Sequence, residues 1–208
     1  MSQKLYNQPL YKLISEQVGR VHGGRVAQQN GELGIEIEVE GNRLPVGVSD
    51  VTKYWRDEHD NSLRGESREY ILTTPINKQF IEEAIVELKE LFKKNKASIN
   101  DSMNTSVHVH LNCQKLTFRQ VATLAVTYYC LEHLLMEYCG EEREGNKFCL
   151  RATDAEGLID FLAGIYRTGR YYNLQSDAYR YAGLNFTSIP KYGSLEFRGM
   201  KGLLDWDG

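Results

Sequence analysis

The sequence predicts a single α+β domain in which a sheet carries helices on one of its faces. Short segments with strict alternation of apolar and polar residues are typical of half-buried strands. Two longer segments carry apolar residues at the three- and four-residue spacing of amphipathic helices. The chain has 208 residues, the length of one domain or of one domain with a short appendage.

The N-terminal 31 residues predict an appendage to this domain. Residues 6–18 fit one short helix. Residues 19–31 contain four glycines among polar residues, a composition typical of a flexible linker. We therefore divide the chain into an appendage with its linker, residues 1–31, and a domain, residues 32–208.

Three strands are predicted before the first long helix. Residues 33–40 alternate apolar side chains with glutamates, and residues 53–58 and 69–73 give two further strands. Asp60 and Asn61 mark the turn between the second and third of these strands.

Two long helices are predicted after these strands. The first spans residues 77–96, with Asn77 as its N-cap. The second runs from the N-cap Thr117 to a stop at Gly140. Residues 155–181 are expected to be helical or irregular.

Three more strands complete the sheet: residues 106–112, 183–189 and 194–199. On the polar side of the strands, the side chains are of the types that coordinate metals and bind phosphates. A face that is merely solvated usually mixes Thr, Lys, Ser, Gln and Glu, and this set contains no lysine. The residues concerned are Glu36, Glu38, Glu69, His108, His110, Asn185, Glu196 and Arg198.

Two pairs within this set indicate a cation site. Glu36 and Glu38 are two residues apart on one strand, so both side chains point to the same face at about 7 Å. A cation between them would relieve their repulsion. His108 and His110 share this geometry. The plainer alternative stays open for both pairs, because glutamates on an exposed strand are common and strand histidines are often surface or packed residues.

Glu196 and Arg198 add an acid and a permanent cation on one face. They could form an exposed ion pair of little energetic consequence. The functional alternative is a metal-ligand carboxylate beside an arginine that holds a phosphoryl group. The sequence contains no glycine-rich phosphate loop, so metals and side chains would have to hold a nucleotide.

Composition excludes several classes of protein. With 25 basic and 28 acidic residues the net charge is −3, which gives no nucleic-acid footprint. No apolar run approaches the ~20 residues that span a bilayer, and the first residues lack the apolar core of a secretory signal. The four cysteines lack C-x-x-C spacing and are expected to be reduced thiols. We therefore expect a cytoplasmic protein without nucleic-acid or membrane partners.

The order of the motifs resembles the putative amidoligase family of phages and bacteria, which is similar in its core to glutamine synthetase and glutamate–cysteine ligase. The resemblance covers residues 33 to about 205. It is carried by residues 34–38, 60–63, 69–75, 106–112, 184–185 and 194–198.

The resemblance implies a curved antiparallel sheet with helices packed on its convex face, as in the catalytic domain of glutamine synthetase. It also implies that ATP enters one end of the sheet, with two or three Mg²⁺ or Mn²⁺ ions between ATP and the strands. Matched position by position, Glu36, Glu38, His108 and Glu196 would bind metal. Glu69 would bind metal or the amine substrate and accept its proton, His110 would contact the nucleotide, Arg198 the transferred phosphoryl group, and Asn185 the substrate carboxylate.

Arg180 lies in a basic series within the irregular region, and we assign it to substrate contact from a lid. The implied enzyme is an ATP- and Mg²⁺-dependent ligase of the cytoplasm, or of the host cytoplasm when phage-encoded. It would join a carboxylate to an amine, on small molecules or peptides, through an acyl phosphate. Fold analogy with glutamine synthetase also allows a homo-oligomer.

The sequence departs from the family pattern after Arg198. The usual Gly-Thr pair is absent, because Leu203 follows Gly202, and we expect the domain to lack the closing C-terminal helix. This departure favours an alternative, a non-catalytic structural or partner-binding module, phage-associated, that retains the fold. A metal-dependent hydrolase or nuclease using the same carboxylates is a third possibility, against which the lack of a basic groove counts.

Overall fold

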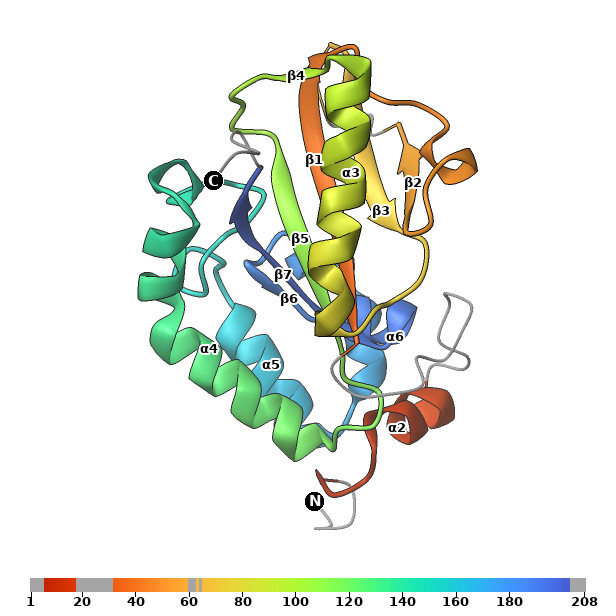
Figure 1. Cartoon of the computed structure of the whole chain (residues 1–208). Coiled ribbons are helices and arrows are strands. Elements are labelled where there is room, and N and C mark those ends of the chain that lie inside the picture. The colour runs from red at the N-terminus through yellow and green to blue at the C-terminus, as the bar shows by residue number, and fades with distance from the viewer. Residues whose placement is uncertain (1–5, 18–31, 60–62, 64, 203–208) are drawn as a thin grey trace.

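The computed structural model describes residues 6–17, 32–59, 63 and 65–202 (Figure 1). It confirms the α+β class: seven antiparallel strands form an open sheet in the order β2-β3-β1-β5-β7-β6, and β4 pairs with β1 off this path. The strands are β1 Leu33–Asn42, β2 Trp55–Glu58, β3 Ser67–Leu72, β4 Ser98–Ile99, β5 Ser106–Asn112, β6 Leu184–Asn185 and β7 Ser194–Lys201.

Five α-helices accompany the sheet within the described part of the chain. They are α2 Leu10–Gln17, α3 Ile81–Asn95, α4 Phe118–Cys139, α5 Leu158–Thr168 and α6 Ser188–Tyr192. Short 3₁₀ helices occupy Val48–Asp50, Lys78–Phe80, Glu141–Arg143, Tyr171–Gln175 and Asp177–Tyr179. None of the helices that the structure describes has the length and apolar character needed to cross a membrane.

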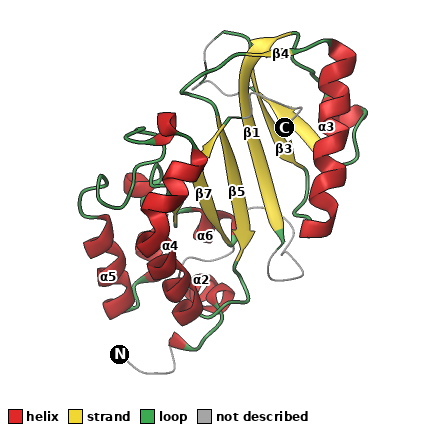
Figure 2. Cartoon of the chain, turned by 60° about the vertical axis from the view of Figure 1, so that its left-hand side comes forward, coloured by secondary structure: helices red, strands yellow, loops and turns green. Residues whose placement is uncertain are grey.

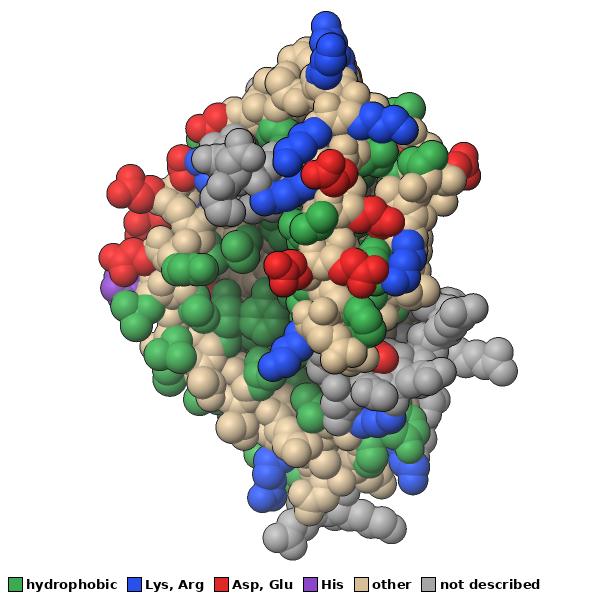
Figure 3. Space-filling view, in the orientation of Figure 1, with side chains coloured by type: hydrophobic (Ala, Val, Ile, Leu, Met, Phe, Trp, Pro, Cys, Tyr) green, Lys and Arg blue, Asp and Glu red, His purple; other side chains and the backbone are tan. Residues whose placement is uncertain are grey.

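Strand register gives the sheet one apolar face. Ile37 lies opposite Tyr70 on β3 and opposite Val107 on β5, and residues that face each other across strands share a face. In Figure 1, α3 crosses in front of β1 and β3, and Figure 2 shows α4 and α5 beside β7, at the other end of the sheet. The face between the helices is not fully covered, because Figure 3 shows a hollow lined by hydrophobic side chains between α3 and α4.

The core therefore has two parts on this face. Under α3, Trp55 donates its indole N–H to the Ala84 carbonyl at 2.7 Å and is fully buried. Under α4, Tyr128 packs edge to face on Phe197 of β7 with ring centroids 5.7 Å apart. Burial of such apolar side chains contributes about 1.5–3 kcal/mol each and fixes which face of the sheet remains polar.

The two long helices occur where the sequence predicts them, although only one has the predicted cap. At α4 the Thr117 hydroxyl accepts from the Gln120 N–H at 3.3 Å, and the Gln120 side chain accepts from the Thr117 N–H at 2.8 Å, which is a capping box. Gly140 ends this helix as predicted. The prediction that Asn77 caps α3 is wrong, because a 3₁₀ turn intervenes and Asn77 makes no side-chain cap bond.

The predicted strands are confirmed except for the fifth. The prediction of a strand over residues 183–189 is wrong beyond Asn185. There the side-chain oxygen of Asn185 accepts from both the N–H and the hydroxyl of Thr187, each at 2.8 Å. This local turn folds the chain into α6, since side-chain bonds of this kind compete with strand pairing. The two-residue strand β4 was not predicted.

The described part of the predicted appendage packs on the domain. Leu10 and Leu13 of α2 are buried in the same cluster as Phe118 of α4. The Leu10 N–H donates to the Leu116 carbonyl at 2.8 Å. Three segments on which predictions were made lie outside the described residues. They are the linker over residues 19–31, the turn residues Asp60 and Asn61, and residues 203–208, where no closing helix was expected.

Candidate active site

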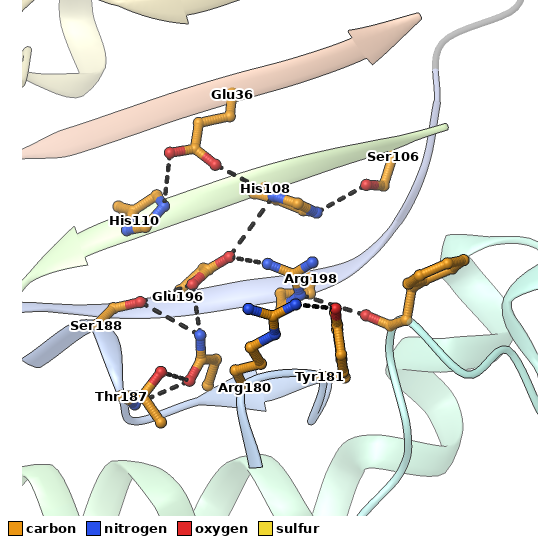
Figure 4. Close-up of polar contacts among 12 residues, drawn as sticks. Glu36, Ser106, His108, His110, Arg180, Tyr181, Thr187, Ser188, Glu196 and Arg198 are labelled. Atoms are coloured by element: carbon orange, nitrogen blue, oxygen red, sulfur yellow. Dashed lines mark hydrogen bonds and ion pairs between the residues drawn. The ribbon is translucent and has the colours of Figure 1, made fainter. Parts of the chain in front are cut away.

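The polar face of the sheet brings together side chains from five strands. Glu38 lies opposite Glu69 on β3, and Glu36 lies opposite His108 on β5. Glu196 on β7 lies opposite both His110 on β5 and Asn185 on β6. The sequence alternation alone predicts that these residues share a face, and the strand order places them beside one another. Figure 4 shows the part of the set around Glu36, His108, His110 and Glu196.

Glu36 is at the centre of the cluster and contacts both histidines. Its Oε2 lies 3.2 Å from His108 Nδ1, and its Oε1 lies 3.3 Å from His110 Nε2. Burial raises the pKa of Glu36, but its close contacts with the two imidazole rings outweigh burial and hold this pKa well below its usual range. Burial lowers the pKa of His110. The neighbouring Glu36 raises this pKa by more than burial lowers it, so the net shift is upward.

Ser106 links His108 to Glu38. The Ser106 hydroxyl donates to the Glu38 carboxylate and lies 2.7 Å from His108 Nε2. Because this hydroxyl has one proton, Nε2 of His108 must itself carry a proton and donate to the serine. In a neutral imidazole the Nδ1 lone pair then faces Glu36 and Glu196, at 3.2 and 3.6 Å. A cation between these groups would satisfy all three.

Glu196 is buried and held on both carboxylate oxygens. Its Oε2 accepts from Asn185 Nδ2 at 2.7 Å and from the Ser188 hydroxyl at 2.6 Å, and its Oε1 pairs with Arg198. Burial raises the pKa of Glu196, and the charges of Arg198, His110 and His108 together lower it by more, so it stays ionised at neutral pH. Asn185 therefore holds Glu196 here, and its contact with a substrate carboxylate stays a prediction.

Two arginines border the cluster around Tyr181. Arg198 is half-buried and donates from Nε to the Phe148 carbonyl at 3.2 Å. Arg180 is exposed, with its guanidinium 4.5 Å from the centre of the Tyr181 ring, and it donates to the Tyr181 hydroxyl. The Arg198 guanidinium lies 5.9 Å from the same ring (Figure 4). Arginines held on an aromatic face keep donors available for an anion.

The donor set fits divalent cations. Two overlapping groups have ligand atoms within 4.8 Å of one another: Glu36, His110 and Glu196, and Glu36, Glu69 and His108. In addition, His110 Nε2 is buried and makes no hydrogen bond of acceptable geometry with any described residue. A buried nitrogen that lies 3.3 Å from Glu36 Oε1 without a well-directed hydrogen bond is explained if it is a metal ligand. The carboxylates suit Mg²⁺ or Mn²⁺, whereas the imidazoles suit transition-metal ions such as Zn²⁺ or Fe²⁺. Glu38 belongs to neither group.

The cluster opens into a cavity of about 310 Å³. Acids from β1 and β3 line one side, and the other side carries Arg198 of β7, paired with Glu196, together with Arg180 and Lys191. A neighbouring cavity of about 620 Å³ shares Glu36, His110 and Tyr192 with it and also contains Arg56. Both are in the range of small-molecule sites, ~300–1,000 Å³. A third cavity, about 510 Å³ between α4 and α5, is almost entirely apolar.

All nine predicted site residues border the first cavity. Residues that the sequence analysis did not identify also border it: Asn104, Phe148, Tyr181, Thr187, Ser188, Lys191 and Tyr192. Ser106, which orients His108, was also missed. A signal for it existed, because it precedes His108 by two positions and so lies on the same face of β5. No strand pattern marks the others, since they come from loops and α6.

Comparison with known proteins gives one match. The model of a family described as putative amidoligase enzyme matches residues 48–207, more than half of the chain. The matched range starts after β1, so Glu36 and Glu38 lie outside it. No curated protein and no solved structure matches the chain.

Proposed function

This chain belongs to the putative amidoligase family, and from that premise we propose that it is an ATP- and Mg²⁺-dependent ligase that joins a carboxylate to an amine. The family description supports a ligase. The ATP dependence, the ions and the acyl phosphate are our proposal. One observation carries this proposal. Two candidate ligand groups that both contain Glu36 border the same cavity as Arg198 of β7 and Arg180 of the adjoining loop.

The arginines on one side of the cavity favour the binding of two anionic substrates there. ATP and the acid substrate are both anions, and their oxygens meet in the transfer of the γ-phosphoryl group to the carboxylate. Arg198 and Arg180 lie on the cationic side, where they would hold these oxygens and offset their repulsion. Mg²⁺ bound by the Glu36 groups would supply Lewis-acid neutralisation of the phosphate oxygens.

The acidic side of the cavity suits the amine. An ammonium substrate must lose a proton before its nitrogen can attack the acyl phosphate and displace phosphate. Glu69 lies on β3, opposite Glu38 and Glu58 in register, so the carboxylates of this side attract a cation. We assign Glu69 as the acceptor of the ammonium proton. The aromatic side chains at the cavity mouth would limit hydrolysis of the activated acid by excluding water.

Calorimetry of ATP binding with and without Mg²⁺ tests the proposal. The wild type should bind ATP only with Mg²⁺, and Glu36→Gln should lose that binding. The matched control is Glu90→Gln, because Glu90 is exposed on α3 and pairs only with Lys93 among the described ion pairs. Equal binding by wild type and Glu36→Gln would sink the site assignment.

Hydroxylamine distinguishes a ligase from a binding module. It replaces the amine and converts an acyl phosphate to a hydroxamate, which is detected with ferric ion. Incubation with Mg²⁺–ATP and a panel of amino acids and dicarboxylates should give hydroxamate and ADP in equal amounts. ATP binding without hydroxamate from any acid in the panel would favour the non-catalytic module, and cleavage of a substrate without ATP would favour a hydrolase.

A further inference from the structure

We infer that Arg143, a buried residue outside the cavity, is a positioning residue that fixes the direction of Arg198. The inference rests on the proposed function for its consequence on ATP, but its geometry stands on the fold alone. It starts from an irregularity in the pairing of β5 with β7.

The irregularity is a bulge opposite His108. Val107 pairs with Met200, and Val109 pairs with Phe197. Arg198 and Gly199 thus face the single residue His108, two residues against one. A bulge of this kind disrupts the hydrogen-bond ladder locally and re-aims a side chain. Alternation from Glu196 already places Arg198 on the polar face, and the bulge changes the register after it, so that Met200 lies opposite Val107 on the apolar face.

Arg143 binds the backbone of the bulge. Its Nη2 donates to the Arg198 carbonyl at 2.9 Å and its Nε to the Gly199 carbonyl at 3.0 Å. Its Nη1 donates to the Thr105 carbonyl at 3.3 Å, just before β5 begins. Arg143 is only 1% exposed, and these carbonyls would otherwise be buried at a break in the ladder. The planar fork of a guanidinium can reach three acceptors at once, whereas an ammonium has a single centre.

The same loop also holds the side chain of Arg198. The Asn146 side chain donates to the Met103 carbonyl at 2.9 Å and accepts from the Phe148 N–H at 2.9 Å. This places the Phe148 carbonyl, which accepts from Arg198 Nε at 3.2 Å. Residues 143–148 therefore clamp Arg198 twice, at its backbone through Arg143 and at its side chain through Phe148.

A clamp of this kind has a functional reason. An arginine side chain has several rotatable bonds and loses rotamer entropy when it is ordered. A clamp that orders Arg198 before an anion arrives removes this cost from binding. Arg143 acts on the anion only through Arg198, which distinguishes it from the residues that border the cavity.

The first test follows the Arg198 Nε–H by NMR, without any ligand. In the wild type this proton should exchange slowly, and its signal is assigned by its loss in Arg198→Lys. In Arg143→Lys, which keeps the charge, exchange should be about tenfold faster, while the amides of Val109 and Ile37 keep their protection. Arg151→Lys is the matched control, because Arg151 pairs with Glu144 and Asp154 and is not bonded to β7.

Asn146→Ala provides a second variant, because it releases Phe148 and leaves the bonds of Arg143 in place. It should speed exchange of the Arg198 Nε–H as well. Unchanged exchange in Arg143→Lys would overturn the inference. So would a loss of protection throughout the sheet, since that would show a purely structural role.

The second test separates the metal from ATP. In Arg143→Lys the dissociation constant of Mn²⁺ alone should stay within about twofold, and that of Mn²⁺–ATP should rise about tenfold. Arg143→Lys combined with Arg198→Ala should be no worse than Arg198→Ala alone; additive losses would overturn the inference. If the wild type does not bind ATP, the proposed function fails, and the NMR result alone decides the role of Arg143.

Discussion

At the scale of single residues, Ser106 shows how a side chain outside the ligand groups determines the state of a ligand. Its hydroxyl fixes the proton of His108 on Nε2, so that the Nδ1 lone pair of the neutral ring points towards Glu36. Partners of this kind orient ligating histidines and raise their basicity. Glu38 acts on His108 indirectly, because it accepts the hydrogen bond of the Ser106 hydroxyl.

Replacing Ser106 by Ala should therefore weaken metal binding about tenfold or more, because the tautomer and ring orientation of His108 are released. Titration with Mn²⁺, followed by electron paramagnetic resonance, measures this. Ser98→Ala is the control, since Ser98 is exposed on β4 away from the cluster. Unaltered affinity in Ser106→Ala would show that His108 binds no metal through Nδ1.

Glu132 on α4 is a buried carboxylate that the proposed chemistry does not use. Its Oε2 accepts from the Ala152 N–H at 2.8 Å, and its Oε1 has no hydrogen-bond partner among the described residues. Burial raises its pKa by more than the Ala152 bond lowers it. The native state therefore binds this proton more tightly than the unfolded chain does.

The consequence is a loss of stability as pH rises. The contribution of protonated Glu132 is complete below the unfolded pKa of about 4.5 and disappears as pH rises through the higher native pKa, by at most about 1.4 kcal/mol per pH unit in that window. Glu132→Gln has no such proton. Its unfolding free energy in urea, relative to wild type, should increase between pH 4.5 and 8. A difference that stays constant with pH would contradict the raised pKa.

At the scale of elements, the close approach of β1 and β4 requires a glycine in β1, which side-chain patterns cannot reveal. Gly41 near the end of β1 pairs with Ile99 of β4. A Cβ on Gly41 would lie well inside van der Waals contact of the Ser98 carbonyl oxygen, which is backbone and cannot move aside. The short strand β4 is therefore possible only because residue 41 has no side chain.

Two alanine substitutions should have opposite effects for this reason. Gly41→Ala should lower the unfolding free energy by about 1–3 kcal/mol, as overpacking does. Gly164→Ala, in α5 where an added Cβ meets nothing within 4 Å, should raise it by about 0.5–1 kcal/mol. Urea unfolding measures both. Equal effects of the two would contradict the close approach of β1 and β4.

The elements that sequence predicts well are those with one strong local signal. Alternation predicts β1, β5 and β7, and periodicity with the N-cap Thr117 and the stop at Gly140 predicts α4. The bulge in β7 and the pairing of β4 depend on contacts between distant residues, and the turn at Asn185 depends on a local side-chain bond that alternation does not reveal. For the same reason the sequence predicts the nine site residues as a set, but not which of them are adjacent. Glu38 and Glu36 have the same pattern, and only the structure separates their surroundings.

At the scale of the molecule, the residues of the candidate site come from four adjacent strands, β3, β1, β5 and β7. Ions bound by Glu36 and its partners on three strands would bind the folded chain and not the unfolded one. Mn²⁺ at a hundredfold its dissociation constant should then raise the melting temperature of the wild type by roughly 5–10 °C. EDTA should reverse the rise, and Glu36→Gln should abolish it. An equal rise in that variant would place the ions elsewhere.

The strand order also bears on how the protein is made. Glu36 and His108 are 72 residues apart in the chain, and His110 and Ser194 are 84 apart, yet each pair meets on neighbouring strands. During synthesis at about 5–20 residues per second, β1 and β5 must therefore wait several seconds for β7. Until β7 arrives, the edge of β5 is unpaired and can join other strands. On the proposed function, the candidate cation site is thus completed late, and binding of Mn²⁺ there would report that β7 has paired with β5.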